Sequence, residues 1–201
     1  MRVIGITGGI ASGKSVLSAY IRSLGYAVFD ADACSVGLTK AGGEALAQIE
    51  SCFGAEFIKD GALDRARMSK EVFDSPQKRI MLENIIHPLV ISRCKEKMRE
   101  CTNEQLFFID APLLLESGMD EMCDEVWLIY APERVRIERA CARSGMEPQQ
   151  VRKRIRSQMP FYLKKRRADH IIDNGGSLEA AMARVSRLIN RAVKKCGVES
   201  V

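Results

Sequence analysis

The chain has no apolar run that approaches the roughly 18 residues a membrane-spanning helix needs. It also has no internal repeat, no low-complexity linker, and no cleavable apolar segment behind a basic start, because Met1–Ile4 lead directly into a strand pattern. With 201 residues, of which 46% are hydrophobic, the chain can bury one good core. We therefore expect a cytoplasmic protein with one core and no membrane partner.

Cysteine pairs at metal-binding spacing are also missing. The seven cysteines are scattered, and none forms a C-x-x-C motif. A secreted disulfide framework and a zinc ribbon are therefore both poorly supported. We expect these cysteines to act as small buried apolar residues rather than as ligands.

The net charge of +5 is concentrated in one segment. Between Arg134 and Arg167 there are twelve basic and two acidic residues, whereas the rest of the chain is mildly acidic. Such a segment could meet nucleic acid or a compact polyanion such as a nucleotide, or it could be a solvated pair of basic helices. Only Phe161 and Tyr162 are available there for base stacking, so we expect no nucleic-acid partner.

Five short apolar runs have the composition of buried strands. They are residues 3–7, 27–30, 106–109, 126–130 and 170–172. The first run is followed by a loop and then by a helical apolar stripe, which consists of Val16, Leu17, Tyr20, Ile21 and Leu24. Gly25 should end this helix, and Ser177 should cap a closing helix. This order implies right-handed parallel crossovers, so the sequence predicts a doubly wound α/β fold with a five-stranded parallel sheet.

Two stretches interrupt the alternation of strands and helices. Residues 34–104 are predicted to be mainly helical, with helices over 44–53 and 64–73 and a third that opens at Ser75-Pro76. Pro88 should end or kink that third helix. Residues 134–167 are the second inserted helical segment, here called the basic excursion because of its charge. Its helices should be interrupted near residues 145 and 148 and again at residue 160.

One motif has a specific chemical meaning. Gly8-x-x-x-x-Gly13-Lys14-Ser15 follows the first strand and opens the first helix, which is the context that a phosphate-binding loop requires. Glycines let backbone N–H groups turn toward phosphate oxygens, and the helix adds its positive end. Lys14 would reach the β- and γ-phosphates, and the Ser15 hydroxyl would bind Mg²⁺. GTPases, motor ATPases and small-molecule kinases share this loop, so it does not identify the reaction.

Three further side chains are candidates for acceptor chemistry. Asp32 lies in Asp30-Ala-Asp-Ala after the second strand, where a carboxylate could take a proton from a substrate hydroxyl or could equally cap a helix. Asp110 ends a buried strand, where a carboxylate could support Mg²⁺ or its water shell, or instead form a cap or pair with a lysine. His87 is a lone helical histidine, a type that is more often structural.

The basic excursion could supply a lid. Arg139 and Arg143 are four residues apart and share a helical face, and Arg154 and Lys164 follow them. Arginines of a closing lid can neutralise the charge that develops during phosphoryl transfer. A closed lid also excludes water, which separates a kinase from an ATPase.

Several segments occur together in a characteristic order. They are ITGGIASGKS, FDADA, LDRARMSKEVF, LENIIHPLV, IDAPLLLES and RSQMPFYLKKRRADHIIDNGGS. From Ile4 to about Ser177 the chain resembles the dephospho-coenzyme A kinase family. The loop is generic, whereas Asp-Ala-Asp, Leu-Glu-x-Ile-x-His-Pro and Ala-Asp-x-Ile-Ile-Asp-Asn are far more specific. The resemblance implies ATP- and Mg²⁺-dependent phosphorylation of the ribose 3′-hydroxyl of dephospho-coenzyme A.

The resemblance also implies a single nucleotide-kinase-like P-loop domain. Its core would be about residues 1–33, 105–133 and 168–197, with an acceptor-binding insertion at 34–104 and a lid at 134–167. Asp32 would be the general base, helped in catalysis by Lys14 and Arg139. Asp32, His87, Asp110 and Arg139 would bind the acceptor, with Ser15 on the metal and Asp110 near it. The nucleotide would be held by Gly9, Ile10, Ala11, Ser12, Gly13, Lys14, Ser15, Val16, Arg143 and Asn174.

Two positions depart from the family pattern. Val16 stands where threonine is usual, and we expect little effect because Ser15 provides the metal-binding hydroxyl. Arg136 stands where glutamine is common, so the resemblance leaves open whether it makes a specific contact. A nucleoside or nucleotide kinase and a nucleic-acid-binding ATPase are the alternative functions, and a monomer is expected, with oligomers left open.

Overall fold

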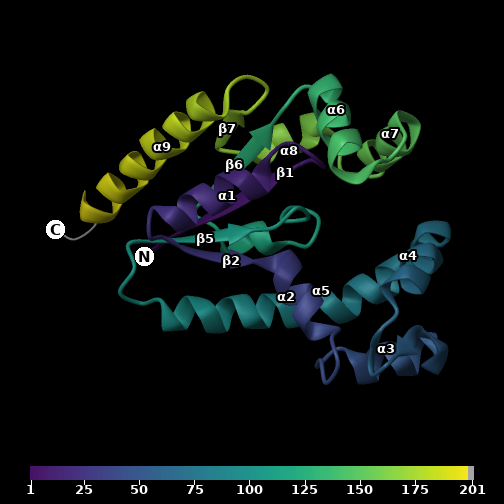
Figure 1. Cartoon of the computed structure of the whole chain (residues 1–201). Coiled ribbons are helices and arrows are strands. Elements are labelled where there is room, and N and C mark those ends of the chain that lie inside the picture. Colours follow the sequence, from purple (N-terminus) through teal and green to yellow (C-terminus); the bar gives the residue numbers. More distant parts are fainter. Residues whose placement is uncertain (199–201) are drawn as a thin grey trace. The chain divides into compact units, whose positions relative to one another are not determined.

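The computed structural model describes residues 1–198 (Figure 1). The chain divides into two compact units. One unit, here called the helical unit, is Asp30–Glu100. The other, here called the sheet unit, combines Met1–Phe29 with the chain from Cys101 onward.

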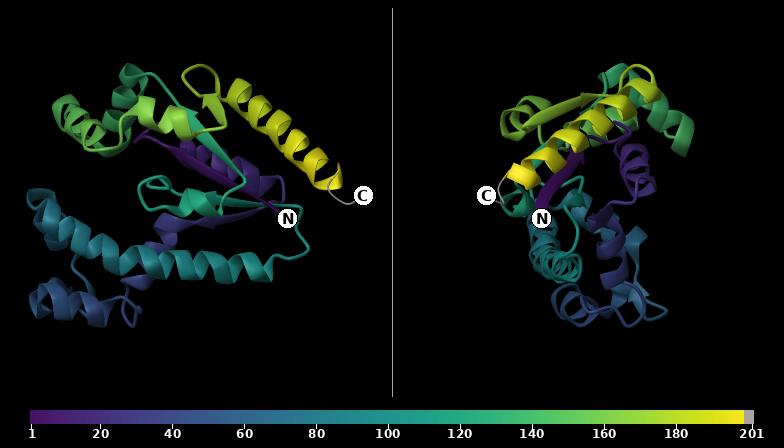
Figure 2. Two further views of the ribbon diagram at one scale, coloured as in Figure 1. Left: turned by 180° about the vertical axis from the view of Figure 1, so that it is seen from behind. Right: turned by 90° about the vertical axis from the view of Figure 1, so that its left-hand side faces the viewer.

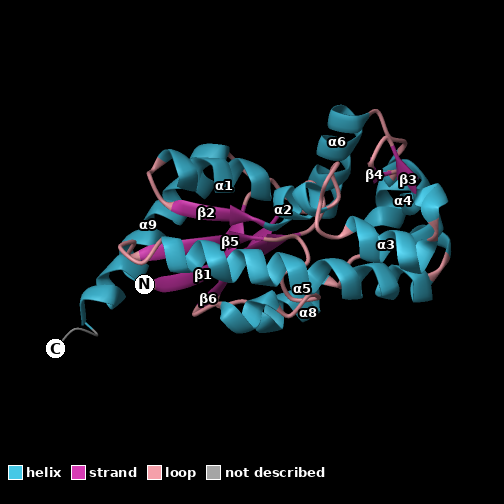
Figure 3. Ribbon diagram, turned by 90° about the horizontal axis from the view of Figure 1, so that it is seen from below, coloured by secondary structure: helices cyan, strands magenta, loops and turns pink. Residues whose placement is uncertain are grey.

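A five-stranded parallel sheet forms the centre of the sheet unit, as the magenta arrows of Figure 3 show. Its strand order is β2-β5-β1-β6-β7. The strands are β1 (Arg2–Gly8), β2 (Ala27–Asp30), β5 (Leu106–Asp110), β6 (Glu125–Tyr130) and β7 (His170–Asp173). The predicted α/β fold with five parallel strands is therefore confirmed.

Two helices, α1 (Lys14–Ser23) and α9 (Leu178–Val198), pack against each other beside this sheet (Figure 2). Their apolar side chains share one core with β1, β5, β6 and β7. In α1, Leu17 and Ile21 are buried as expected, whereas Val16 and the C-cap residue Leu24 are 46% and 45% exposed. The buried stripe of this short helix is thus narrower than predicted. Ser177 caps α9 as predicted, because its hydroxyl accepts a hydrogen bond from the Ala180 N–H at 3.2 Å.

Three helices in the sheet unit follow the predicted breaks of the basic excursion. They are α6 (Glu133–Ser144), α7 (Pro148–Arg156) and α8 (Phe161–Arg167). Ile137, Ala140 and Val151 form a small core of their own between α6 and α7. A short 3-10 helix, η2 (Met119–Met122), lies between β5 and β6.

The helical unit is built around its longest helix, α5 (Pro76–Glu100), which contacts α2 (Ala31–Leu38), α3 (Leu46–Phe53) and α4 (Arg65–Asp74). A 3-10 helix, η1 (Ala55–Phe57), and a small antiparallel hairpin, β3 (Ile58–Lys59) with β4 (Ala62–Leu63), connect α3 to α4. The mainly helical character of this stretch is as predicted, but the hairpin was not predicted.

Pro88 does not end its helix, because α5 continues without interruption to Glu100. Proline removes one backbone hydrogen bond from a helix interior. Burial of Ile85, Ile86 and Val90 on the core side of α5 offsets that loss.

The seven cysteines are free, but only Cys94 is fully buried, so the expectation of buried cysteines holds at one position. Across residues 1–198, no helix combines the length and apolarity needed to cross a membrane. Within the same residues, no group of three or more His, Cys, Asp or Glu side chains is arranged to hold a metal by itself.

Candidate functional site

The loop between β1 and α1 has the backbone shape of a phosphate-binding loop. Gly13 directly precedes α1 and has φ +90, a conformation that favours glycine. A Cβ on Gly8 would lie 2.8 Å from the Ile129 carbonyl oxygen, so the chain can pass there only without a side chain. The first N–H groups of α1 have no partner within the helix and carry its positive end. The loop can therefore receive an anion.

Lys14 and Asp110 form an ion pair at the start of α1 and the end of β5. Asp110 is almost fully buried, with 3% of its side chain exposed, and the side chain of Lys14 is 12% exposed. Of the two structural alternatives for Asp110, a cap and a lysine pair, the structure has the lysine pair. The Lys14 ammonium thus neutralises the carboxylate.

The two residues after Lys14 are open to solvent. Ser15 and Val16 are both exposed in the first turn of α1. A hydroxyl at Ser15 and a carboxylate at Asp110 are hard oxygen donors, which Mg²⁺ prefers. Mg²⁺ in kinases is commonly held by one or two protein oxygens together with phosphates and water, so this small donor set fits it.

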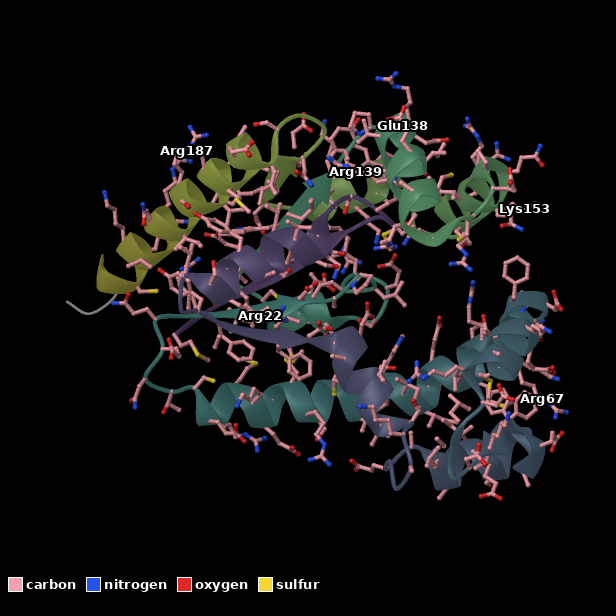
Figure 4. All side chains as sticks on the ribbon, viewed as in Figure 1. Arg22, Arg67, Glu138, Arg139, Lys153 and Arg187 are labelled. Atoms are coloured by element: carbon pink, nitrogen blue, oxygen red, sulfur yellow. The ribbon has the colours of Figure 1, made fainter. Side chains whose placement is uncertain are left out.

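Arg139 of α6 reaches back toward the phosphate loop, and Figure 4 labels it beside the outward-facing Glu138. Its Nη1 atom lies 3.7 Å from the position that a Cβ on Gly13 would take. That atom is buried and has no hydrogen-bond partner among the described residues. Arg143, one turn later, is exposed at the end of α6. A buried guanidinium N–H without a partner is costly, so Arg139 is prepared to accept an anionic ligand.

Asn174, which directly follows β7, also contacts the phosphate loop. Its Nδ2 donates to the Ser12 carbonyl at 2.8 Å, and its own N–H donates to the Tyr130 carbonyl at 2.8 Å. Its Oδ1 is buried without a hydrogen-bond partner among residues 1–198. Asn174 therefore holds the loop and keeps one acceptor available.

Two residues that were absent from the predicted site also bind the phosphate loop. The Arg136 Nε donates to the Ile10 carbonyl at 2.9 Å, and the Ile10 N–H donates to the Gln158 side-chain oxygen at 2.9 Å. The pKa of Arg136 is lowered overall, because the effect of burial exceeds the opposing effect of the Glu133 carboxylate. Gln158 belongs to the segment Arg-Ser-Gln-Met-Pro, which resembles the family, but the position of Gln158 in the sequence does not indicate a contact with Ile10.

The other two basic side chains singled out in the lid differ in exposure. Arg154 is exposed on α7. Lys164 is buried, where its ammonium donates to the Pro112 carbonyl at 3.1 Å and pairs with Glu116 at 2.9 Å. Lys164 therefore fixes the loop after Asp110 rather than moving freely in a lid.

A cavity of about 350 Å³ lies next to the phosphate loop within the sheet unit. Gly9 and Ser12 line it from the loop, and Arg136, Gln158 and Phe161 line it from the lid. The Ser12 hydroxyl is buried there and has no partner among the described residues. The cavity thus combines apolar walls with a few polar groups.

In the helical unit, the two aspartates of the Asp-Ala-Asp motif are not equivalent. Asp30 is the N-cap of α2, since its carboxylate accepts a hydrogen bond from the Ala33 N–H at 2.9 Å. Asp32 lies in the first turn of the same helix and is exposed. The capping alternative therefore describes Asp30.

Two other features belong to the helical unit. A cavity of about 230 Å³ is lined by Ser35 of α2, by the C-cap residue Thr39, and by Arg65, Met68 and Ile86. His87 is half-buried on α5. The pKa of His87 is lowered overall, because the effect of burial exceeds the opposing effect of the neighbouring Glu83.

Comparison with known proteins identifies a consistent set of relatives. The chain matches the dephospho-CoA kinase family over residues 2–180. It is 41% identical to the dephospho-CoA kinase of Symbiobacterium thermophilum, over 99% of this chain and 83% of that protein. It is 37% identical to the dephospho-CoA kinase of Carboxydothermus hydrogenoformans, over 94% of this chain and 93% of that protein.

Solved structures give the same result. Protein TT1252 of Thermus thermophilus has a TM-score of 0.82 at 34% identity, covering 94% of this chain and 97% of that one. The dephospho-CoA kinase of Campylobacter jejuni has a TM-score of 0.71 at 28% identity, covering 97% and 99%. A shikimate kinase of Acinetobacter baumannii, with a TM-score of 0.54 at 12% identity over 97% of this chain and 94% of that one, shares the fold alone.

Proposed function

Because the chain belongs to the dephospho-CoA kinase family, we propose that it transfers the γ-phosphoryl group of ATP to the ribose 3′-hydroxyl of dephospho-coenzyme A. The products would be coenzyme A and ADP. The observation that carries this proposal is the family match over residues 2–180, which includes both units rather than the phosphate loop alone.

The donor side of the site is assigned to the phosphate loop. Gly9 to Val16 would surround the phosphates of ATP, with Lys14 moving from Asp110 to the β- and γ-phosphates. Its present pairing with Asp110 supports this role, because the ammonium already lies at the end of the loop. Mg²⁺, when bound, offsets phosphate charge, and Ser15 would hold it with Asp110 nearby.

The acceptor side is assigned to the helical unit. Asp32 would take the proton of the ribose hydroxyl, because it is exposed and Asp30 performs the capping. His87 and Asp110 would contact the acceptor. The cavity lined by Ser35 and Thr39, one to two turns along α2 from Asp32, would receive part of the coenzyme A moiety.

Lid residues complete the proposed site. Arg139 would stabilise charge on the transferring phosphoryl group, since its buried Nη1 is close to Gly13 and has no partner in the described chain. Arg143 and Asn174 would contact the nucleotide. By excluding water, residues 134–167 would direct the phosphoryl group to the acceptor rather than to hydrolysis.

Four further properties are part of the proposal. The enzyme would require Mg²⁺, act as a monomer in the cytoplasm, and bind no nucleic acid. Residues 1–33, 105–133 and 168–197 would act as the catalytic core, and 34–104 as the acceptor-binding insertion.

The proposal is tested by incubating the full chain with ATP, Mg²⁺ and dephospho-coenzyme A and measuring product masses. We expect a product heavier than dephospho-coenzyme A by one phosphoryl group, together with ADP. Reactions without Mg²⁺ and reactions without the acceptor are the controls. ADP formation that is unaffected by the acceptor would instead indicate an ATPase.

A nucleoside or nucleotide kinase is the second candidate, because the phosphate loop and lid arginines serve such enzymes equally well. Competition between dephospho-coenzyme A and nucleoside monophosphates in an ADP-release assay separates the two. Preference for a simple nucleoside or nucleotide would favour the second candidate.

A further inference from the structure

One residue of the phosphate loop has an unfavourable backbone conformation. Ala11 has φ +57, in the left-handed region that side chains disfavour. Glycine adopts this conformation freely, but alanine does not. Something other than local preference must therefore hold the loop in this shape.

Hydrogen bonds fix the chain immediately before Ala11. Gln158, between α7 and α8, accepts from the Ile10 N–H at 2.9 Å, and Arg136 of α6 donates from Nε to the Ile10 carbonyl at 2.9 Å. The two side chains are also joined to each other, since the Arg136 Nη2 donates to the Gln158 oxygen at 3.3 Å. Both backbone polar groups of Ile10 are thus bound by side chains of the lid.

The chain after Ala11 is fixed as well. The Ser12 N–H donates to the Gly9 carbonyl at 3.0 Å, and the Ser12 carbonyl accepts from Asn174 at 2.8 Å. Arg136 lies so close to Gly9 that its Cζ would be 2.7 Å from a Cβ there. Ala11 is therefore the left-handed link between two segments whose backbone is held by hydrogen bonds.

We propose that Arg136 and Gln158 are positioning residues that hold the phosphate loop in its nucleotide-binding shape by fixing the Ile10 backbone ahead of the left-handed Ala11. This inference rests on the proposed role of the loop in binding ATP. Neither side chain needs to touch the nucleotide. Their contribution is to prevent Ala11 from relaxing to a negative φ, which would turn the following N–H groups away from the phosphates.

The test is a pair of double-mutant cycles that combine Gln158→Leu or Arg136→Leu, each of which removes the hydrogen-bonding group, with Ala11→Gly. The dissociation constant for Mg²⁺-ATP is measured by calorimetry. With Ala11 in place we expect each lid substitution to weaken binding by about 5- to 30-fold, the range that corresponds to one left-handed alanine. When Ala11→Gly is also present, the same substitutions should weaken binding by less than about threefold, because glycine adopts φ > 0 without the steric cost that alanine has.

Two exposed residues provide matched controls. Arg134→Leu makes the same change on the same helix, where the Arg134 side chain is 85% exposed, and Gln150→Leu makes the same change on the exposed surface of α7. Both should bind Mg²⁺-ATP as the wild type does. Thermal unfolding of each variant separates loss of loop shape from general destabilisation.

Equal losses of affinity with and without the Ala11→Gly substitution would overturn the proposal, as would wild-type affinity in Gln158→Leu. A wild-type protein without measurable affinity for ATP would overturn both the proposal and the assigned function. A wild-type protein that binds ATP and shows the expected cycle, yet makes no product from dephospho-coenzyme A, would support the positioning role and contradict the proposed acceptor.

Discussion

Asp30→Ala and Asp32→Ala form a matched pair of substitutions that separates helix capping from proton transfer. Both residues belong to the start of α2, two positions apart, and both substitutions remove one carboxylate. Only the Asp30 carboxylate accepts the capping hydrogen bond, from the Ala33 N–H at 2.9 Å. The two variants should therefore differ in which property they lose.

The expected magnitudes follow from these positions. Removal of an N-cap aspartate typically costs about 1 kcal/mol of stability. Removal of an acid from the first helical turn costs about 0.3–1 kcal/mol of favourable interaction with the helix dipole. A general base contributes about 10²- to 10⁴-fold to the rate. Asp32→Ala should thus lose turnover by that factor and no more stability than Asp30→Ala, whereas Asp30→Ala should lose about 1 kcal/mol of stability and keep most of its turnover.

The assay measures ADP release at saturating ATP and dephospho-coenzyme A, alongside urea unfolding and calorimetric ATP binding. Asp32→Ala should bind ATP as the wild type does. Wild-type-like turnover in this variant would remove Asp32 from the role of base. A large loss of turnover in a folded Asp30→Ala protein would assign the base role to Asp30 instead.

Three further predictions concern buried groups. Lys164→Met should lower the free energy of unfolding by roughly 1.5–3 kcal/mol in urea titrations, because Glu116 loses a charged partner, and an unchanged midpoint would contradict this. Burial lowers the pKa of His87 in the folded state, so the unfolded state takes up the proton first as the pH falls. The free energy of unfolding should therefore decrease as the pH drops below 6.5. His87→Gln should reduce the slope of this free energy against pH, measured by unfolding between about pH 7.5 and 5. Burial raises the pKa of Cys94 to about 12, so a maleimide should label Cys94 only after unfolding. The exposed Cys52 should be labelled rapidly in the native protein. Peptide mass mapping distinguishes the two sites.

The fold was largely predictable because its main elements have strong local patterns. Short apolar runs, a loop with glycines and a serine cap mark the strands and α9 without reference to the rest of the chain. A helix end at Pro88 was wrong for the same reason. The local preference of proline opposes a helix, whereas Ile85, Ile86 and Val90 on the same helix are buried and keep it continuous. Tertiary burial of this kind cannot be read from a single sequence window.

The candidate site was predictable only in part. Lys14 and Ser15 follow from the loop motif, because one short segment contains the complete pattern. Arg136 and Gln158 are 126 and 148 residues away from Ile10, which both contact. No spacing rule brings such residues together. Their hydrogen bonds depend on the packing of the lid helices, and the only sequence signal was their presence in segments that resemble the family.

The Lys14–Asp110 pair shows why the chemistry of a site cannot be read from residue types alone. Considered separately, a phosphate-binding lysine suggests a site for an anion, and a metal-supporting carboxylate suggests a site for a cation. In the structure they neutralise each other, and Asp110 is 3% exposed, so removing Lys14 from it would leave a buried carboxylate at a cost of several kcal/mol. Movement of Lys14 to a phosphate therefore requires a new cation for Asp110. In the proposed site, Mg²⁺-ATP would supply the anion for Lys14 and a cation near Asp110 together. We therefore expect calorimetry to show weaker binding of ATP alone than of Mg²⁺-ATP.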